Sequence, residues 1–314
     1  MRVELVHDLL RAENPLDPVF RVLSQEIWSA TSFREHSQAG TLDQYLTHNE
    51  HVASELERQV YDVYDDLYRE IEEPQAGTDR VQQLLSGSQY TLVVFDGLSL
   101  REMPALLETI IGAGLAPTAS YVVAPVPSET DEFAKRHFNT TGPGQLEGTL
   151  RDFVYRYVKR DDWQPDFAAN QRKRVIWVLY PDNVFRLDSE AVDYRRYVVE
   201  PVQRVLSATI AADPVFPLVV TSDHGYLWQG GSAPWALGEE EARLLAKHFK
   251  AGRSTDEATS ALIHTRKVWI SGTRAAARGR FAWGGAVKGA TRLFKHGGVS
   301  FMESIVPWME IKSA

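Results

Sequence analysis

The segment Val219–Gly225, with the sequence VVTSDHG, decides the fold of this 314-residue chain. It reads as an apolar strand that ends in an Asp-His pair and a glycine. Ligands of open α/β sheets bind outside the carboxyl ends of parallel strands, and Asp oxygen and His nitrogen bind divalent metals. Asp223 and His224 are therefore candidate metal ligands. The alternative is a β-turn in which Asp223 caps a following helix and His224 is exposed.

Two further segments have related features. Residues 91–97 (TLVVFDG) form another run of β-branched and aromatic residues, which ends in Asp96 and a glycine. Asp96 could also be a simple helix cap. Residues 295–300 (KHGGVS) place His296 against two glycines, shortly before the apolar run 304–309. This pattern suggests a backbone that passes close to another group.

Strand and helix signals alternate along most of the chain. Such alternation indicates a mostly parallel sheet with helices on both faces, and a continuous apolar run is typical of a buried parallel strand. The expected strands are 89–95, 119–124, 174–180, 216–221, 267–271 and 305–311, and the expected helices are 100–114, 145–159, 194–211 and 239–250.

Taken in order, the strand-Asp-Gly at Asp96, the Ser-Asp-His-Gly at Asp223 and His224, and the His-Gly-Gly-x-Ser at His296 resemble the alkaline phosphatase superfamily, and within it the PglZ domain. The following residues 303–307 (ESIVP) add to the PglZ resemblance, which covers about residues 88 to 314. The resemblance implies an alkaline-phosphatase-like domain at 86–314 that acts on phosphate esters. PglZ domains occur in phage-defence systems such as BREX, which implies antiviral defence and partner proteins of such a system.

The resemblance also places a nucleophilic hydroxyl after the second strand, in the segment 124–131 (APVPSETD). Thr130 matches the position best, and Ser128 is the alternative. A hydroxyl becomes a competent nucleophile when a cation stabilises its alkoxide. Either residue could also be only the cap of the helix that follows.

For a second metal, the resemblance implies an Asp, a His four residues later and the late His296. The chain departs from this pattern, because neither Asp182 nor Asp188 has a His four residues on. Asp193 or Glu190 could replace that His, which leaves the second site either carboxylate-rich or degenerate. Zinc is the first choice for one or two metals, since the ligands mix Asp and His without Cys, and manganese or magnesium would suit a carboxylate-rich site.

The N-terminal region differs from the rest in composition. Residues 1–80 carry 17 acidic and 7 basic side chains, and residues 60–68 have apolar positions at helical spacing. We expect a helical N-terminal extension over residues 1–85, which either caps the sheet or forms a docking face. The chain has no cysteine, so thiolate ligands are excluded. Its N-terminus lacks a signal-peptide core and no apolar run reaches membrane-spanning length, so we expect a cytoplasmic protein without membrane contact.

A basic tract precedes His296. Residues 261–300 contain eight Lys or Arg and no Asp or Glu. Arg278, Arg280 and Lys295 are the substrate-binding candidates, because Lys and Arg contacts to phosphates dominate nucleic-acid binding. The alternative is an ordinary solvated face.

These features predict a metal-dependent phosphodiesterase that acts on nucleotides or nucleic acid. A plain phosphomonoesterase or phosphomutase is a further option. The opposing hypothesis is a catalytically weak or inactive PglZ-fold interaction module in a multi-protein defence assembly.

Overall fold

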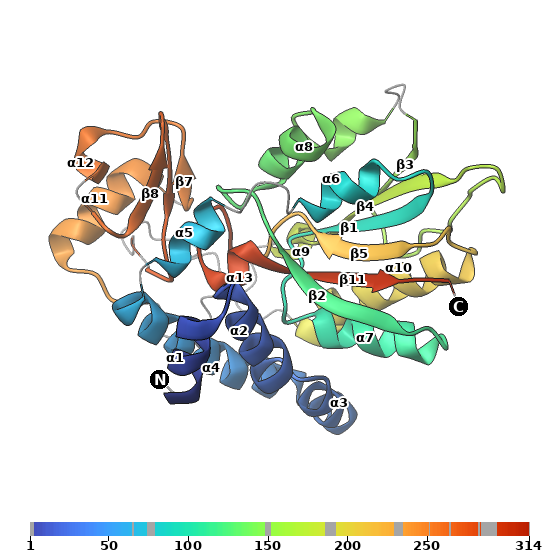
Figure 1. The fold of residues 1–314 in the computed structure, drawn as a ribbon, viewed down its shortest axis with the longest axis horizontal. Coiled ribbons are helices and arrows are strands. Elements are labelled where there is room, and N and C mark those ends of the chain that lie inside the picture. Colours follow the sequence, from blue (N-terminus) through green and yellow to red (C-terminus); the bar gives the residue numbers. More distant parts are fainter. Residues whose placement is uncertain are drawn as a thin grey trace.

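The computed structural model describes residues 3–64, 66–73, 79–147, 152–185, 193–228, 235–250, 252–263, 265–281, 283 and 294–313. Helices make up the beginning of the chain, and after them strands and helices alternate (Figure 1). The N-terminal elements are α1 (Val3–Arg11), α2 (Leu16–Arg21), η1 (Val22–Ile27), α3 (Ala30–Ala39), α4 (Leu42–Val63), α5 (Leu67–Glu72) and α6 (Arg80–Leu85).

The central sheet has six strands in the order β2-β11-β5-β1-β4-β3. β5, β1, β4 and β3 are parallel, whereas β11 is antiparallel to both of its neighbours. β2 therefore runs in the same direction as the parallel strands, and the expectation of a mostly parallel sheet is confirmed. The six strands are β1 (Tyr90–Asp96), β2 (Pro117–Val123), β3 (Val154–Val158), β4 (Lys173–Pro181), β5 (Leu218–Ser222) and β11 (Ile305–Ile311).

Helices cover both faces of the sheet, as expected, because alternate residues of each buried strand point to opposite faces. In β1, Val93 and Phe95 join the core under α7 (Met103–Gly112) and α10 (Glu200–Ala211). Leu92 and Val94 join the core under α6 and α8 (Thr130–Phe138). Figure 1 shows these two helix layers on either side of the sheet. The short helices between them are η2 (Pro143–Leu146), α9 (Asp182–Phe185) and η3 (Arg195–Val199).

A smaller lobe follows β5 along the chain. It contains the antiparallel sheet β7-β9-β8 and two helices around a core of its own. Its end is tied to the main body by backbone bonds between Gly279 and Val299 and between Val299 and Ala277, both of 2.7 Å. The lobe and its flanking ribbon consist of β6 (Leu227–Trp228), α11 (Glu239–Phe249), β7 (Ser254–Thr255), α12 (Ser260–Ile263), β8 (Val268–Ser271), β9 (Arg274–Ala277) and β10 (Phe294–Lys295). The short helix α13 (Phe301–Ser304) packs in the main core and leads into β11.

The prediction of a helix over 145–159 was wrong in its second half, because residues 154–158 form strand β3 beside β4. Phe153, Tyr155 and Tyr157 alternate along this segment and pack into the core under α8. Apolar residues here fit both a helical and a strand period, and the excess of aromatic and β-branched side chains favours the strand.

The N-terminal helices are present as expected and share one continuous core with the sheet. The boundary at residue 85 stays a prediction. Among the described residues, no helix is long and apolar enough to cross a membrane.

Buried ion pairs join the N-terminal helices to the rest of the chain. On α4, Glu50 accepts hydrogen bonds of 2.7 Å from both Nε and Nη2 of Arg101 and also pairs with Arg280. Glu57 pairs with Arg280 at 2.7 Å and accepts a bond of 2.9 Å from the N–H of Phe301. All four charged side chains are at most 3% exposed. The inward acidic face of α4 is thus an internal cap on the sheet and the C-terminal segment.

These contacts correct the expectation that Arg278 and Arg280 bind substrate. Arg280 is buried between two carboxylates, and Arg278 pairs with Glu72 of α5 through both Nε and Nη2. Of the two alternatives for the acidic extension, these pairs favour the cap on the sheet, because Glu50, Glu57 and Glu72 neutralise Arg278 and Arg280 of the basic tract within the chain.

Arg280→Met should destabilise the fold by about 3–5 kcal/mol, because it leaves the Glu57 carboxylate buried without its cation. Urea unfolding measures the change. Arg243→Met is the matched control, since Arg243 pairs with Glu239 on the exposed surface of α11 and such pairs contribute little. An Arg280→Met protein of unchanged stability that binds phosphate esters more weakly would return Arg280 to the substrate site.

Candidate metal centre and nucleophile

Three adjacent strands deliver carboxylates to one edge of the sheet. Asp96 is the last residue of β1, Asp223 follows β5, and Asp182 follows β4 at the start of α9. β1 lies between β5 and β4 and is parallel to both, so their carboxyl ends are neighbours. These carboxylates and His224 are at most 2% exposed. Buried charges of this kind are paired or bind metals.

Asp96, Asp223 and His224 form a compact group. One ligand atom from each lies within 4.8 Å of the others. His224 Nε2 is 3.6 Å from Asp96 Oδ1 and 3.9 Å from Asp223 Oδ2. The alternatives of a helix cap and an exposed histidine do not describe these residues, since β6 follows the Asp-His pair, α7 begins only at Met103, and His224 is buried.

The orientation of these donors fits a divalent metal. Asp223 Oδ1 accepts bonds from the N–H of Gly97 at 3.0 Å and of His224 at 2.8 Å, whereas its buried Oδ2 has no hydrogen-bond partner. His224 Nδ1 lies 2.9 Å from the carbonyl of Gly225. A neutral imidazole that donates from Nδ1 to that carbonyl presents the Nε2 lone pair to the group, as metal-ligating histidines do.

The electrostatics indicate an excess of negative charge. Burial raises the pKa of Asp223, and His224 only partly opposes this change. Burial alone would lower the pKa of His224, but Asp223, Asp96 and Asp182 outweigh it and raise that pKa to about 9. The carboxylates therefore favour a cation among them, which a bound dication would supply.

Thr130 lies against this group. Its hydroxyl donates to Asp96 Oδ1 at 3.1 Å and is 3.2 Å from His224 Nε2. Thr130 is the first residue of α8, but the cap position belongs to Glu129, and no side chain caps this helix end. The Thr130 hydroxyl is thus directed at the carboxylates and is no helix cap, while its own side chain remains half-exposed.

Ser128, the alternative nucleophile, is engaged elsewhere. Its hydroxyl donates to the carbonyl of Gly298 at 2.9 Å and accepts from the N–H of Gly297 at 3.1 Å. The side chain is fully buried. This corrects the expectation for Ser128, because its hydroxyl fastens the loop that carries His296 and is not presented to a substrate.

His296 and Asp182 lie beside the first group. The His296 ring stacks on His224 with centroids 4.3 Å apart, and its Nε2 is 3.5 Å from Asp182 Oδ1. Asp188 and Glu190 lie outside the described residues. Asp193 is exposed and accepts a bond of 3.0 Å from the N–H of Arg196 at the start of η3. Asp182 and His296 are therefore the described members of the expected second site.

Two glycines explain the Asp-Gly and His-Gly patterns. Gly97 has φ +76°, and a Cβ there would lie 3.2 Å from Cβ of Asp182. A Cβ on Gly225 would lie 2.0 Å from the carbonyl oxygen of Met302. Gly97 is thus favoured by its left-handed backbone, and Gly225 by an approach to Met302 that only glycine permits.

Sequence reasoning missed Glu303, which links both ligand loops. Its carbonyl accepts a bond of 2.8 Å from the N–H of Gly225. Its carboxylate accepts bonds from the N–H of Gly298 at 2.9 Å and from Arg253 Nε at 2.8 Å. Glu303 is fully buried. Its place at the start of the motif 303–307 (ESIVP), just before the last apolar run, was the signal in the sequence.

A cavity of about 330 Å³ borders the centre. Asp182, His296 and Lys295 line it together with Glu129, which sequence reasoning also missed. The substrate-binding expectation for Lys295 stays a prediction, and its position beside His296 is compatible with it. In the sequence, only its position next to Thr130 pointed to Glu129.

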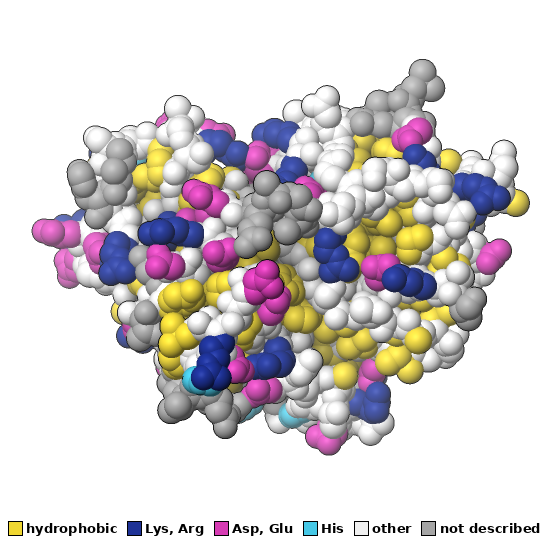
Figure 2. All heavy atoms as spheres, viewed as in Figure 1, with side chains coloured by type: hydrophobic (Ala, Val, Ile, Leu, Met, Phe, Trp, Pro, Cys, Tyr) yellow, Lys and Arg dark blue, Asp and Glu magenta, His cyan; other side chains and the backbone are white. Residues whose placement is uncertain are grey.

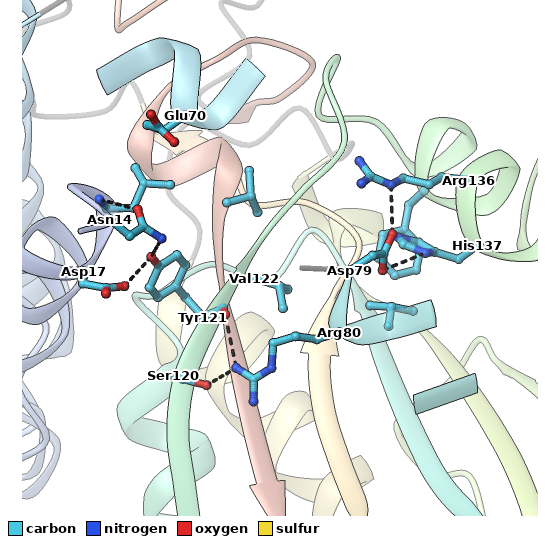
Figure 3. Close-up of a pocket in the computed structure, with 14 residues that line it drawn as sticks. Asn14, Asp17, Glu70, Asp79, Arg80, Ser120, Tyr121, Val122, Arg136 and His137 are labelled. Atoms are coloured by element: carbon cyan, nitrogen blue, oxygen red, sulfur yellow. Dashed lines mark hydrogen bonds and ion pairs between the residues drawn. The ribbon is translucent and has the colours of Figure 1, made fainter. Parts of the chain in front are cut away.

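A separate cavity of about 290 Å³ lies between α2, α6, α8 and the outer strand β2. Figure 3 shows that its polar side chains bond to one another: Asp79 contacts Arg136 and His137, and Tyr121 contacts Asn14 and Asp17. The residues of the candidate centre do not line this cavity.

Comparisons with known proteins give limited results. No protein-family model matches the chain, and no curated protein matches it. Among solved structures, a phosphonoacetate hydrolase from Sinorhizobium meliloti 1021, in complex with phosphonoformate, has 14% identity and a TM-score of 0.39, over 71% of this chain and 89% of that chain. Murine ectonucleotide pyrophosphatase/phosphodiesterase 5, in complex with AMP, has 11% identity and a TM-score of 0.41, over 72% and 88%. These values assign neither a family nor an activity to this chain.

Asp223→Asn should abolish retention of a divalent metal, because it removes one negative ligand from a buried group of three. Elemental analysis after zinc or manganese loading and gel filtration measures the metal content. Asp162→Asn, at an exposed surface pair with Arg160, should retain the wild-type content. Equal metal content in the wild type and Asp223→Asn would remove Asp223 from the ligand set.

Glu303→Gln should weaken metal affinity by about 10–100-fold, since residues that orient ligand segments have effects of this size. The amide oxygen can still accept both bonds, but it carries no charge to neutralise the buried guanidinium of Arg253. Competition with a chromogenic chelator measures the affinity, and thermal unfolding reports the fold separately. A variant that loses stability but keeps full affinity would show that Glu303 supports only the fold.

Proposed function

We propose that this chain is a metal-dependent phosphoesterase whose nucleophile is the Thr130 hydroxyl. The observation that carries the proposal is the contact of that hydroxyl with Asp96 and His224, both members of the buried metal-binding group. An N-cap serine or threonine would instead direct its oxygen to the backbone of its own helix.

Asp96, Asp223 and His224 would hold one divalent metal, with zinc as first choice and manganese or magnesium as alternatives. Asp182 and His296 would contribute to a second, and Asp188 remains a candidate for it. A divalent metal bound there supplies Lewis acidity and charge stabilisation for a phosphoryl oxygen and for the nucleophilic hydroxyl.

In this mechanism, Thr130 supplies the nucleophile, and neighbouring residues hold the loop beside it in place. The Thr130 hydroxyl gives its proton to solvent and its oxygen attacks phosphorus, while the bond to the leaving oxygen breaks and that oxygen takes up a proton. Water later cleaves the phosphothreonine ester, which releases the phosphate product and restores the Thr130 hydroxyl. A phosphoryl group on Thr130 would lie at the N-terminus of α8, where the helix dipole favours an anion. Ser128 and Glu303 hold the neighbouring loop that carries His296.

Within this class we propose a phosphodiesterase that acts on nucleotide-sized substrates. Polynucleotide binding loses its main support, because Arg278 and Arg280 pair with carboxylates of the N-terminal helices. The face in Figure 2 shows acidic and basic side chains interspersed, with no continuous basic track. Lys295 is the remaining described cation of the expected anion site.

Membership of the PglZ group, and with it a place among the proteins of a phage-defence system, is proposed on the three motifs alone. The opposing hypothesis of an inactive interaction module predicts an intact fold without metal-dependent turnover. The acidic docking face that it invoked is in part internal, because Glu50, Glu57 and Glu72 pair with arginines inside the molecule.

Thr130→Ala should lower hydrolysis of bis(4-nitrophenyl) phosphate by at least on the order of 10³-fold, as loss of a nucleophile does, while metal content is retained. Steady-state kinetics of the zinc-loaded and manganese-loaded proteins measure turnover. Thr118→Ala, at an exposed position on β2, is the matched control. Full activity of Thr130→Ala would end the covalent mechanism. A metal-loaded wild type without activity on phosphate esters would favour the interaction module.

A further inference from the structure

The cavity beside the candidate metal centre is lined by both acidic and basic side chains. Asp182 and His296 form its border with the centre, and Glu129, Ser254 and Lys295 form part of its wall. The cavity lies next to the Thr130 hydroxyl, because its wall residue His296 stacks on His224 and that hydroxyl is 3.2 Å from His224 Nε2. It is therefore the space available to the other substituents of a phosphorus that Thr130 attacks.

The Glu129 carboxylate is held in this wall. Its Oε1 accepts a hydrogen bond from the Ser254 hydroxyl of β7. It also lies against the His296 loop, since a Cβ on Gly297 would be only 2.9 Å from Oε1. Glu129 is the N-cap residue of α8 but makes no capping bond there. The side chain therefore extends away from its own helix and toward the cavity.

The arginines near Glu129 form ion pairs with other acidic side chains. Arg253 also lines the cavity, but it is 1% exposed and donates to Glu303 and to the carbonyl of Phe281. Arg274 pairs with Glu132 at 2.6 Å and with Asp256 at 3.3 Å. Burial raises the pKa of Glu129, whereas Ser254, His224 and Arg274 oppose that rise.

We propose that Glu129 makes this site selective for singly charged phosphodiesters over doubly charged phosphomonoesters. The inference rests on the proposed phosphoesterase function and names the residue and charge class that define its substrate. A phosphomonoester carries about −1.5 to −2 charges at pH 7. Its additional negative charge would lie beside the Glu129 carboxylate in a poorly solvated wall, where like charges repel more strongly than in water. A diester has one negative charge and places an esterified oxygen there.

The test compares kcat/KM for bis(4-nitrophenyl) phosphate and 4-nitrophenyl phosphate in the metal-loaded protein. The wild type should prefer the diester. Glu129→Gln should raise the monoester-to-diester ratio by about tenfold or more, mainly through the monoester, because it removes charge at constant shape. Glu129→Asp keeps the charge and should keep the wild-type preference. Glu132→Gln is the matched control, since Glu132 lies in the same helical turn but pairs with Lys135 and Arg274 outside this cavity.

Calorimetry with inorganic phosphate gives a readout independent of turnover. Glu129→Gln should bind it more tightly than the wild type, whereas Glu132→Gln should not. Thermal unfolding verifies that each variant is folded, and Glu129→Ala serves as a second charge-removing variant if Glu129→Gln is not. A wild type that prefers the monoester, or an unchanged ratio in the folded charge-removing variant, would overturn the role of Glu129. If no ester is hydrolysed, the proposed function fails, and equal phosphate affinity in the wild type and the charge-removing variant then overturns this inference as well.

Discussion

Mutual repulsion among buried carboxylates is the constraint on which this structure depends. The parallel register of β5, β1 and β4 brings Asp223, Asp96 and Asp182 to one edge, out of contact with water. A sheet core cannot hold such charges without compensation. His224 supplies part of it, and its raised pKa shows how strongly the position attracts positive charge. Gly97, Gly225, Ser128 and Glu303 hold the segments that carry these charges in place.

Ion pairs also join the N-terminal helices to later parts of the chain. Acids of α4 and α5 meet arginines that come from β1's following loop and from the segment after β9. Removing any one partner leaves a charge inside the protein, so these residues depend on one another. The same pairing places part of the acidic excess of the N-terminal region against part of the basic tract.

The sequence predicted the sheet and the proximity of Asp96, Asp223 and His224 well, for a physical reason. Strands buried on both faces are continuous apolar runs, and a polar residue at the end of such a run is conspicuous, as at Asp96 and Asp223. Long-range pairing was not predictable from local patterns. Nothing near Arg280 indicates Glu57, and nothing near Ser128 indicates Gly298, since these contacts exist only once distant segments pack. The strand at 154–158 was wrongly predicted as helix for a different reason, because its aromatic residues fit both the helical and the strand period.

The position of β11 has a consequence for how the protein is made. β2 lies at the edge of the sheet and joins it only through β11, the last strand in the chain. More than half of the sequence separates the two strands, so their pairing is a contact of very high sequence separation, which slows folding. During synthesis, the segment that leads to Thr130 has no strand to pair with until the C-terminal residues emerge. Thr130 and the carboxylates can therefore meet only after β11 has been made and has paired with β2 and β5.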